Sequence, residues 1–432
     1  MLKKNPAQPY SIVTLPTGLR VLTVPLHDTK AVTVLVLTKV GSRYESKRIN
    51  GISHFVEHLM FKGTKKRPNS LAISKLLDGV GAEYNAFTSK DHTGYYVKIN
   101  SEHLDLALDV VSDMLNNSKF DPKEIDRERG VIIEEINMYE DNPLMYLEDI
   151  FEQTLYSGST LGRLIAGPRI NIKNISRQNI LDFVKTHYIP SNMLVAVSGR
   201  FDETKIKKQI KSYFSQTSAK RTPSRFKKFS YQGSKPKIGL EYKDTEQAQI
   251  GLGFPAVSYF SNQLSAFVIL STILGGNMSS RLFIQIRERR GLAYAIRCTP
   301  TVYQDTGNLF IQAGVARARA EESISAILFE LEKVADKGVT SVELARAKEF
   351  IKGKLILELE DSESIGAWFA KQWLLTNKIE TPNDKLIKIQ AVTKEQVNLL
   401  AKKLFKRSRL NLAVIGPFKS TKQFGKLINK KS

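Results

Sequence analysis

The chain has few cysteine and histidine residues and no long apolar run. One cysteine, Cys298, among 432 residues excludes an intrachain disulfide and is typical of a reducing cytoplasm. No apolar run reaches the ~18 residues of a membrane span, and the N-terminal residues lack the apolar core of a signal peptide. We therefore expect a cytoplasmic protein without a membrane span, in which Cys298 is a buried core residue rather than a nucleophile.

Acidic residues are also scarce relative to basic ones. The 43 Asp and Glu residues are outnumbered by 65 Lys and Arg residues, so the formal net charge is +22. Such an excess can maintain solubility or serve contact with RNA or anionic membranes. The chain has no recognised nucleic-acid-binding motif, which argues against nucleic acid as a partner. The hydrophobic content of 42% is typical of a globular protein, and 432 residues are too many for one compact core.

Two of the six histidines lie four residues apart, at His54 and His58, with Glu57 directly before the second. Apolar residues around them recur with the helical period, which predicts an amphipathic helix with both imidazoles and the carboxylate on one side. Two imidazoles at this spacing can bind one zinc ion, and a hydrolytic site adds a third ligand and a carboxylate base for the attacking water. The order His-x-x-Glu-His is the inverzincin signature, with Glu57 as the base.

A third ligand has to come from elsewhere in the chain. A capping sequence at Asp121 predicts a second helix that ends before Pro143. Glu128 and Glu135 are seven residues apart on one face of this helix. Taken by themselves, these glutamates are more typical of a solvated charged face than of a metal site.

Together these segments resemble the M16 metallopeptidases, in particular the bacterial branch related to the mitochondrial processing peptidase. The likeness extends over nearly the whole chain, with 76 residues between His58 and Glu135. It implies one zinc ion per chain, with Glu57 as general base and Glu128 as a hydrogen-bonding partner of a ligand imidazole. The implied zinc ligands are His54, His58 and Glu135. Glu134, about 100° away around the helix, is the weaker choice for the third ligand.

Two further pairs match motifs of the same family. Asn85 and Ala86 resemble the edge strand that holds the main chain of the substrate, although the residues alone are also compatible with a turn into an ordinary strand. Arg287 and Tyr294 resemble an arginine and tyrosine pair that completes the site, where a guanidinium and a hydroxyl would stabilise the oxyanion. Arg289 is the alternative to Arg287.

An internal repeat predicts the architecture without reference to the family. Residues 172–201 align without a gap on residues 389–418, a shift of 217 residues. Both copies contain a helix, capped by Ser176 or Thr393, that leads into an apolar strand and a glycine turn. We therefore predict an α+β fold with two homologous units of sheet plus helices. The expected domains are residues 1–217 with the zinc site, a basic linker at 218–237, and residues 238–432 without a metal site.

The resemblance implies a zinc metalloendopeptidase that hydrolyses unfolded or extended peptides. Family members enclose a clamshell chamber with four such domains, so this chain would form half of it. The implied assembly is a homodimer or a heterodimer with an inactive homologue. Because the chain is strongly cationic, we expect general processing of short peptides rather than cleavage of basic presequences. Two alternatives remain: an inactive structural or partner subunit of an M16-type heterodimer, and a basic RNA-binding protein.

Overall fold

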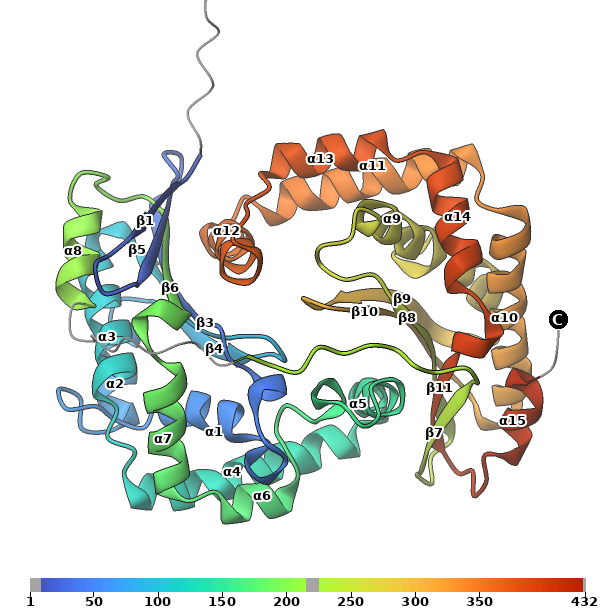
Figure 1. The fold of residues 1–432 in the computed structure, drawn as a ribbon, viewed down its shortest axis with the longest axis horizontal. Helices are drawn as coiled ribbons and strands as arrows, with labels where there is room; N and C mark the ends of the chain where they lie inside the picture. Colours follow the sequence, from blue (N-terminus) through green and yellow to red (C-terminus); the bar gives the residue numbers. More distant parts are fainter. Residues whose placement is uncertain (1–8, 215–224, 430–432) are drawn as a thin grey trace, which may run out of the picture. The chain divides into compact units, whose positions relative to one another are not determined.

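The computed structural model describes residues 9–214 and 225–429, which form two compact units. Unit 1 comprises residues up to 136 together with 163–226 and 356–380, and unit 2 comprises residues 137–162, 227–355 and those from 381 onward. Each unit contains one sheet with helices packed against it, which confirms the predicted α+β class (Figure 1). Residues 218–224 of the expected linker lie outside the described residues, and residues 225–236 form no helix or strand.

The sheet of unit 1 has six strands in the order β1-β2-β6-β3-β5-β4. The strands are β1 (Ser11–Thr14), β2 (Arg20–Pro25), β3 (Ala31–Thr38), β4 (Glu83–Thr88), β5 (Thr93–Asn100) and β6 (Met193–Gly199). The helices are α1 (Ile52–Leu59), α2 (Ser70–Asp78), α3 (Leu104–Asn117), α4 (Pro122–Asp141, which continues into unit 2), α6 (Arg169–Asn174), α7 (Arg177–His187), α8 (Ile206–Tyr213) and α12 (Ser362–Thr376).

The sheet of unit 2 has five strands in the order β7-β11-β8-β10-β9. The strands are β7 (Lys237–Tyr242), β8 (Gln247–Ala256), β9 (Ala293–Val302), β10 (Gly307–Ala316) and β11 (Asn411–Gly416). The helices are α5 (Pro143–Leu155), α9 (Leu264–Gly275), α10 (Ala320–Lys337), α11 (Ser341–Glu358, which continues into unit 1), α13 (Pro382–Ala391), α14 (Lys394–Leu404) and α15 (Lys422–Ile428).

The two sheets share one topology, as the sequence repeat predicts. In both, a central strand pairs antiparallel with a late strand of the same unit: β3 with β6, and β8 with β11. The late strand then pairs parallel with an outer strand, β2 or β7. The predicted caps are also confirmed, because Ser176 and Thr393 each form a capping box at the start of α7 and α14.

The two units are discontinuous in sequence, unlike the expected domains, which are contiguous and end and begin at residues 217 and 238. Each half of the chain contributes one helix to the unit that contains the other half's sheet. α5 comes from the first half of the chain but packs on β11, β8 and β7 in unit 2. α12 comes from the second half but packs on β6, β3 and β2 in unit 1. The two helices occupy corresponding positions of the repeat, so each half provides the same helix to the other sheet.

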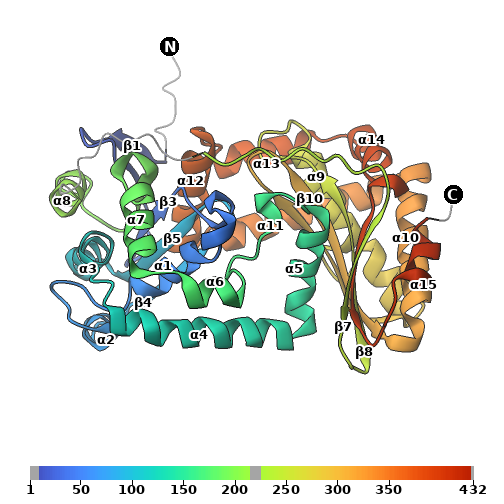
Figure 2. The same ribbon diagram turned by 60° about the horizontal axis from the view of Figure 1, so that its bottom comes forward.

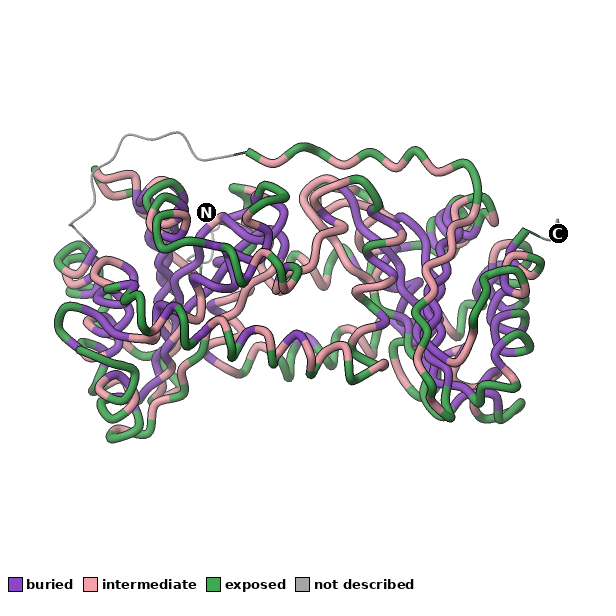
Figure 3. The backbone as a smooth tube through the Cα atoms, turned by 90° about the horizontal axis from the view of Figure 1, so that it is seen from below, coloured by how far each residue is buried: buried purple, intermediate pink, exposed green. Residues whose placement is uncertain are grey.

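This exchange explains why both faces of the unit 1 sheet are apolar. Along β3, Val34 and Val36 face the cluster that includes α1, whereas Leu35 and Leu37 pack with Phe369 of α12. Figure 3 shows the strands as largely buried and the described part of the linker as largely exposed or intermediate. A sheet covered on both faces has near-continuous apolar strands, which are visible in the sequence as Val32 to Leu37.

Candidate metal and catalytic site

Helix α1 carries the His-x-x-Glu-His motif at the surface of the unit 1 core. Its apolar side is fully buried through residues such as Phe55 and Val56, which holds the helix in one orientation. The helix begins after Gly51, whose φ of 104° is left-handed. The first turn is capped by Glu45, whose carboxylate accepts hydrogen bonds from the backbone N–H groups of Gly51 and Ser53 at 2.8 Å each.

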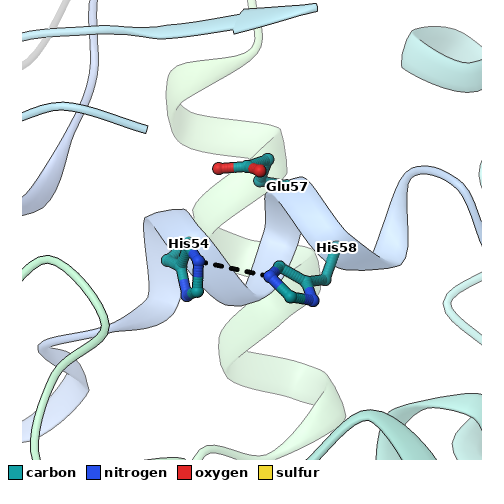
Figure 4. A group of neighbouring side chains, drawn as sticks. All are labelled: His54, Glu57 and His58. Atoms are coloured by element: carbon teal, nitrogen blue, oxygen red, sulfur yellow. Dashed lines mark hydrogen bonds between the residues drawn. The ribbon is translucent and has the colours of Figure 1, made fainter. Parts of the chain in front are cut away.

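The two imidazoles of the motif face one another across one helical turn. Nε2 of His54 and Nε2 of His58 are 3.2 Å apart (Figure 4). Glu57 lies on the same helix, with its carboxylate within 4.8 Å of both imidazole ligand atoms. The geometry therefore brings two nitrogen donors and a carboxylate to one point, as the spacing predicted.

Helix α4 brings a second carboxylate to the imidazoles. It is one unbroken helix of 20 residues (Figure 2). Oε2 of Glu135 lies 3.5 Å from Nε2 of His54 and 3.4 Å from Nε2 of His58. The neighbouring Glu134 is exposed. The structure thus brings Glu135 rather than Glu134 to the two histidines.

The three donor atoms fit the size of a zinc ion. Ligands about 2.0–2.1 Å from a tetrahedral zinc lie about 3.3–3.4 Å from one another. The triangle formed by the two Nε2 atoms and Oε2 of Glu135 has sides of 3.2, 3.5 and 3.4 Å. Two imidazoles and one carboxylate also form the donor set of a catalytic rather than a structural zinc site, because a fourth position stays open for water.

Glu128, one of the predicted residues, contacts the rear of the site. Its Oε1 lies 2.9 Å from Nδ1 of His58, and its Oε2 lies 2.8 Å from Nζ of Lys62. A carboxylate at Nδ1 sets the tautomer that leaves Nε2 free for a metal. Nδ1 of His54, by contrast, is buried without a hydrogen-bond partner among the described residues.

The charges of the site are strongly coupled. Burial lowers the pKa of His58, but its hydrogen bonds with Glu128 and Glu135 outweigh burial and raise the pKa to about 9. Burial and the neighbouring charge of His58 lower the pKa of His54 to about 4. The hydrogen bond from His58 is also the main reason why the pKa of Glu135 is lowered. These opposite shifts favour the protonated form of His58, which donates to the two glutamates, and the neutral form of His54.

Glu57 is held by a residue that the sequence analysis did not single out. Thr88, the last residue of β4, donates a hydrogen bond to Oε2 of Glu57 at 2.5 Å. Burial raises the pKa of Glu57, although the Thr88 hydrogen bond acts in the opposite direction. No sequence signal could have identified this pair, because the two residues are 31 positions apart and neither spacing nor residue type links them.

The two residues predicted to contact the substrate lie on the same strand as Thr88. Asn85 and Ala86 are in β4, which forms the edge of the unit 1 sheet and pairs with β5 on one side. An edge strand has unpaired backbone N–H and C=O groups along its outer side. The strand that could accept an extended peptide therefore ends at the carboxylate of Glu57.

Arg287 and Tyr294 lie side by side in unit 2. The guanidinium carbon of Arg287 is 5.6 Å from the ring centre of Tyr294. Arg287 belongs to a π-helical turn, η6 (Phe283–Glu288), a rare conformation that often marks functional sites. The register between β9 and β10 shifts at Gly314, which leaves Tyr294 as the extra residue of a β-bulge, 77% exposed. A bulge of this kind directs one side chain out of the ladder.

Together these features form an inverted His-x-x-Glu-His motif with a glutamate from a second helix beside it, an arrangement typical of one class of hydrolytic metal centres. Comparison with known proteins agrees. Residues 20–169 match the family described as "Insulinase (Peptidase family M16)", and residues 174–351 match "Peptidase M16 inactive domain". The chain belongs to the M16 peptidase family.

Several relatives cover nearly all of the chain. An uncharacterised zinc protease of Streptomyces coelicolor is 36% identical, with 94% of this chain and 89% of that protein covered. The uncharacterised zinc protease YmxG of Bacillus subtilis is 34% identical over 94% of this chain and 97% of its own length. A probable mitochondrial-processing peptidase subunit beta of Arabidopsis thaliana is 32% identical over 96% of this chain and 80% of its own.

A crystal structure of a protease from Helicobacter pylori has the same fold. It superposes with a TM-score of 0.90 at 27% identity, covering 94% of this chain and 99% of the other.

Among the described residues, no helix combines the length and apolar character needed to span a bilayer.

Proposed function

We propose that the protein is a zinc-dependent endopeptidase that hydrolyses unfolded or extended peptides. The observation that carries this proposal is the triangle of donor atoms from His54, His58 and Glu135, which matches the spacing of tetrahedral zinc ligands, with Glu57 beside it. When bound there, one zinc ion per chain would polarise the attacking water and the scissile carbonyl.

Glu57 would act as the general base. Its carboxylate accepts the proton of the attacking water and then delivers it to the leaving amine. Burial raises the pKa of Glu57, which suits a group that must both take up and release a proton. The hydroxyl of Thr88 holds one carboxylate oxygen, so the other oxygen is available to the water. Glu128 would keep the imidazole of His58 in the tautomer that presents Nε2 to the metal.

The substrate would bind as an additional strand along β4. Its main chain would pair with the outer edge of β4 near Asn85 and Ala86, where it would replace the hydrogen bond from the backbone N–H of Ala86 to Oδ1 of Asn85. The scissile bond would then pass Glu57, because β4 ends at Thr88. Arg287 and Tyr294 match the family's arginine and tyrosine pair, and on the basis of that resemblance they would supply the donors for the oxyanion.

The proposed assembly is a dimer, either of two copies of this chain or with an inactive homologue. Support comes from the relative in Arabidopsis thaliana, whose name describes one subunit of a larger peptidase. The single cysteine, Cys298, is buried as a free thiol, and burial raises its pKa, so it is not a nucleophile. A free thiol is compatible with the proposed cytoplasmic location.

The test combines metal analysis with a quenched-peptide assay on a diverse peptide library. We expect stoichiometric zinc in the wild type and in Glu57→Gln, and a loss of activity of about 10²- to 10⁴-fold in Glu57→Gln, because the base is removed and the ligands are kept. Glu134→Gln is the matched control and should retain both zinc and activity. If zinc-loaded wild type and Glu57→Gln were equally inert, the peptidase proposal would be wrong.

A further inference from the structure

Unit 2 contains a pocket that is separate from the proposed peptidase site. Its volume is about 360 Å³, and it lies among α9, η6, α10 and α11. Small-molecule sites commonly have volumes of this order. The wall includes the apolar side chains of Ile273, Ile284 and Ala347. All residues that line this pocket belong to one compact unit.

The rim of the pocket carries three cations without partners. Arg289 lies in the turn after η6, Lys333 in α10 and Arg346 in α11. All three are exposed, and within residues 225–429 none of them has a hydrogen bond or ion pair. A fourth cation, Arg281, differs because Glu343 binds it in a bidentate manner at 2.9 and 2.7 Å. Like charges that converge on one hollow repel one another unless an anion lies between them.

The floor of the pocket carries two buried polar groups with free hydrogen-bonding capacity. Ser280 is 3% exposed, and its Oγ has no hydrogen-bond partner in the described part of the chain. Glu330 is 1% exposed. One of its carboxylate oxygens lies 3.6 Å from Arg290, and the other, Oε2, has no hydrogen-bond partner among the same residues. Buried polar atoms are nearly always hydrogen-bonded, so both atoms indicate a ligand that reaches the floor. Because a free carboxylate oxygen only accepts, that ligand must bring a donor.

We propose that this pocket binds a small phosphate ester whose organic part carries hydroxyl or amino groups. The phosphate would lie between Arg289, Lys333 and Arg346, since its charge of about −1.5 to −2 and its three acceptor oxygens match three converging cations better than a single carboxylate does. The organic part would donate to Glu330 and contact Ser280 on the floor. The carboxylate of Glu330 on the floor would repel a polymer that is anionic along its whole length, so the proposed ligand is a compact ester.

The pocket shares its helical segment with Arg287. Ile284 and Gln285 of the pocket lie within η6, and Arg289 follows it directly. Arg287 itself is directed to Phe283 and Tyr294, with ring centres at 4.7 and 5.6 Å from its guanidinium carbon. Arg287 therefore contacts two aromatic rings, whereas Arg289 lines the pocket. The proposed phosphate site does not include the proposed oxyanion donors.

The test is isothermal titration of the full-length, zinc-loaded protein with a panel of four phosphate monoesters: glucose 6-phosphate, ribose 5-phosphate, glycerol 3-phosphate and adenosine monophosphate. Glucose and inorganic phosphate serve as partial ligands. We expect at least one ester to bind more tightly than inorganic phosphate, and glucose not to bind. Lys333→Ala and Arg346→Ala should each weaken ester binding about tenfold, because each removes one charged donor.

Two further variants distinguish the pocket from general surface charge. Ser280→Ala should weaken ester binding but leave inorganic phosphate binding unchanged, since it alters the floor and not the rim. Lys337→Ala removes an exposed lysine of α10 outside the pocket and should bind like the wild type. The proposal is overturned if none of the esters binds below about 10 mM, if inorganic phosphate binds as tightly as every ester, or if the two rim variants bind like Lys337→Ala.

Discussion

Replacing Glu128 by glutamine tests whether the metal site depends on the carboxylate behind His58. The Glu128 side chain is 2% exposed and lies 2.9 Å from Nδ1 of His58. In the glutamine variant the amide oxygen can still accept this hydrogen bond, but the negative charge is lost. Loss of such a partner typically costs about 10- to 100-fold in metal affinity, or about 1.4–2.7 kcal/mol.

The position of Lys62 moves the expected effect to the upper end of that range. Its ammonium lies 2.8 Å from the second oxygen of Glu128 and would remain near the metal without a counter-charge. We therefore expect about 100-fold weaker zinc binding in Glu128→Gln. The double variant Lys62→Met/Glu128→Gln should recover part of the loss, because it removes the uncompensated cation.

The assay is a competition titration with a fluorescent zinc chelator at pH 7. Glu134→Gln, an exposed glutamate on the same helix, is the charge-matched control and should bind like the wild type. Circular dichroism of the metal-free variants checks that the fold is intact. The reasoning is refuted if folded Glu128→Gln binds zinc within about threefold of the wild type, or if removing Lys62 weakens binding further.

Three other predictions concern the proposed metal ligands and the proposed oxyanion donor. Glu135→Gln should abolish most zinc affinity in chelator competition, whereas Glu134→Gln should not; the reverse result would move the third ligand by one residue. Because ligand imidazoles must be neutral and the pKa of metal-free His58 is about 9, zinc affinity should rise with pH up to that value, with about one proton released per zinc at pH 7. Calorimetric titrations in buffers of different ionisation enthalpy measure the number of protons released. If no proton is released on zinc binding, His58 is not the protonated ligand that this prediction requires. Tyr294→Phe should lower kcat more than it raises KM in the peptide assay, and an unchanged kcat would assign Tyr294 to packing.

Features that depend on local spacing were predictable from the sequence. The helix of the His-x-x-Glu-His motif follows from its apolar period, and α4 begins and ends where the sequence at Asp121 and Pro143 indicated. The caps Ser176 and Thr393 were also readable, because a capping box is a contact between residues three apart. Such features depend on φ, ψ and side-chain geometry within one or two helical turns.

Contacts between distant segments were not predictable in the same way. Glu45 caps α1 from outside the helix, and Thr88 reaches Glu57 from an edge strand. Both depend on how strands and helices pack, which no period in a single sequence encodes. Glu135 was placed with the histidines only through resemblance to a family, since its spacing alone also suited a solvated face.

The sequence by itself determined the His-x-x-Glu-His motif of the proposed site and the duplication. Donor types and helical spacing define the motif, and a repeat of 217 residues is visible without any fold. Only the tertiary structure decided which helices cover each of the two sheets. A sheet with two apolar faces needs a cover on each, and packing provides it by exchanging α5 and α12 between the units. The same packing brings Thr88 to Glu57 and Glu128 to His58, because burial and hydrogen bonding act between residues that are neighbours only after folding.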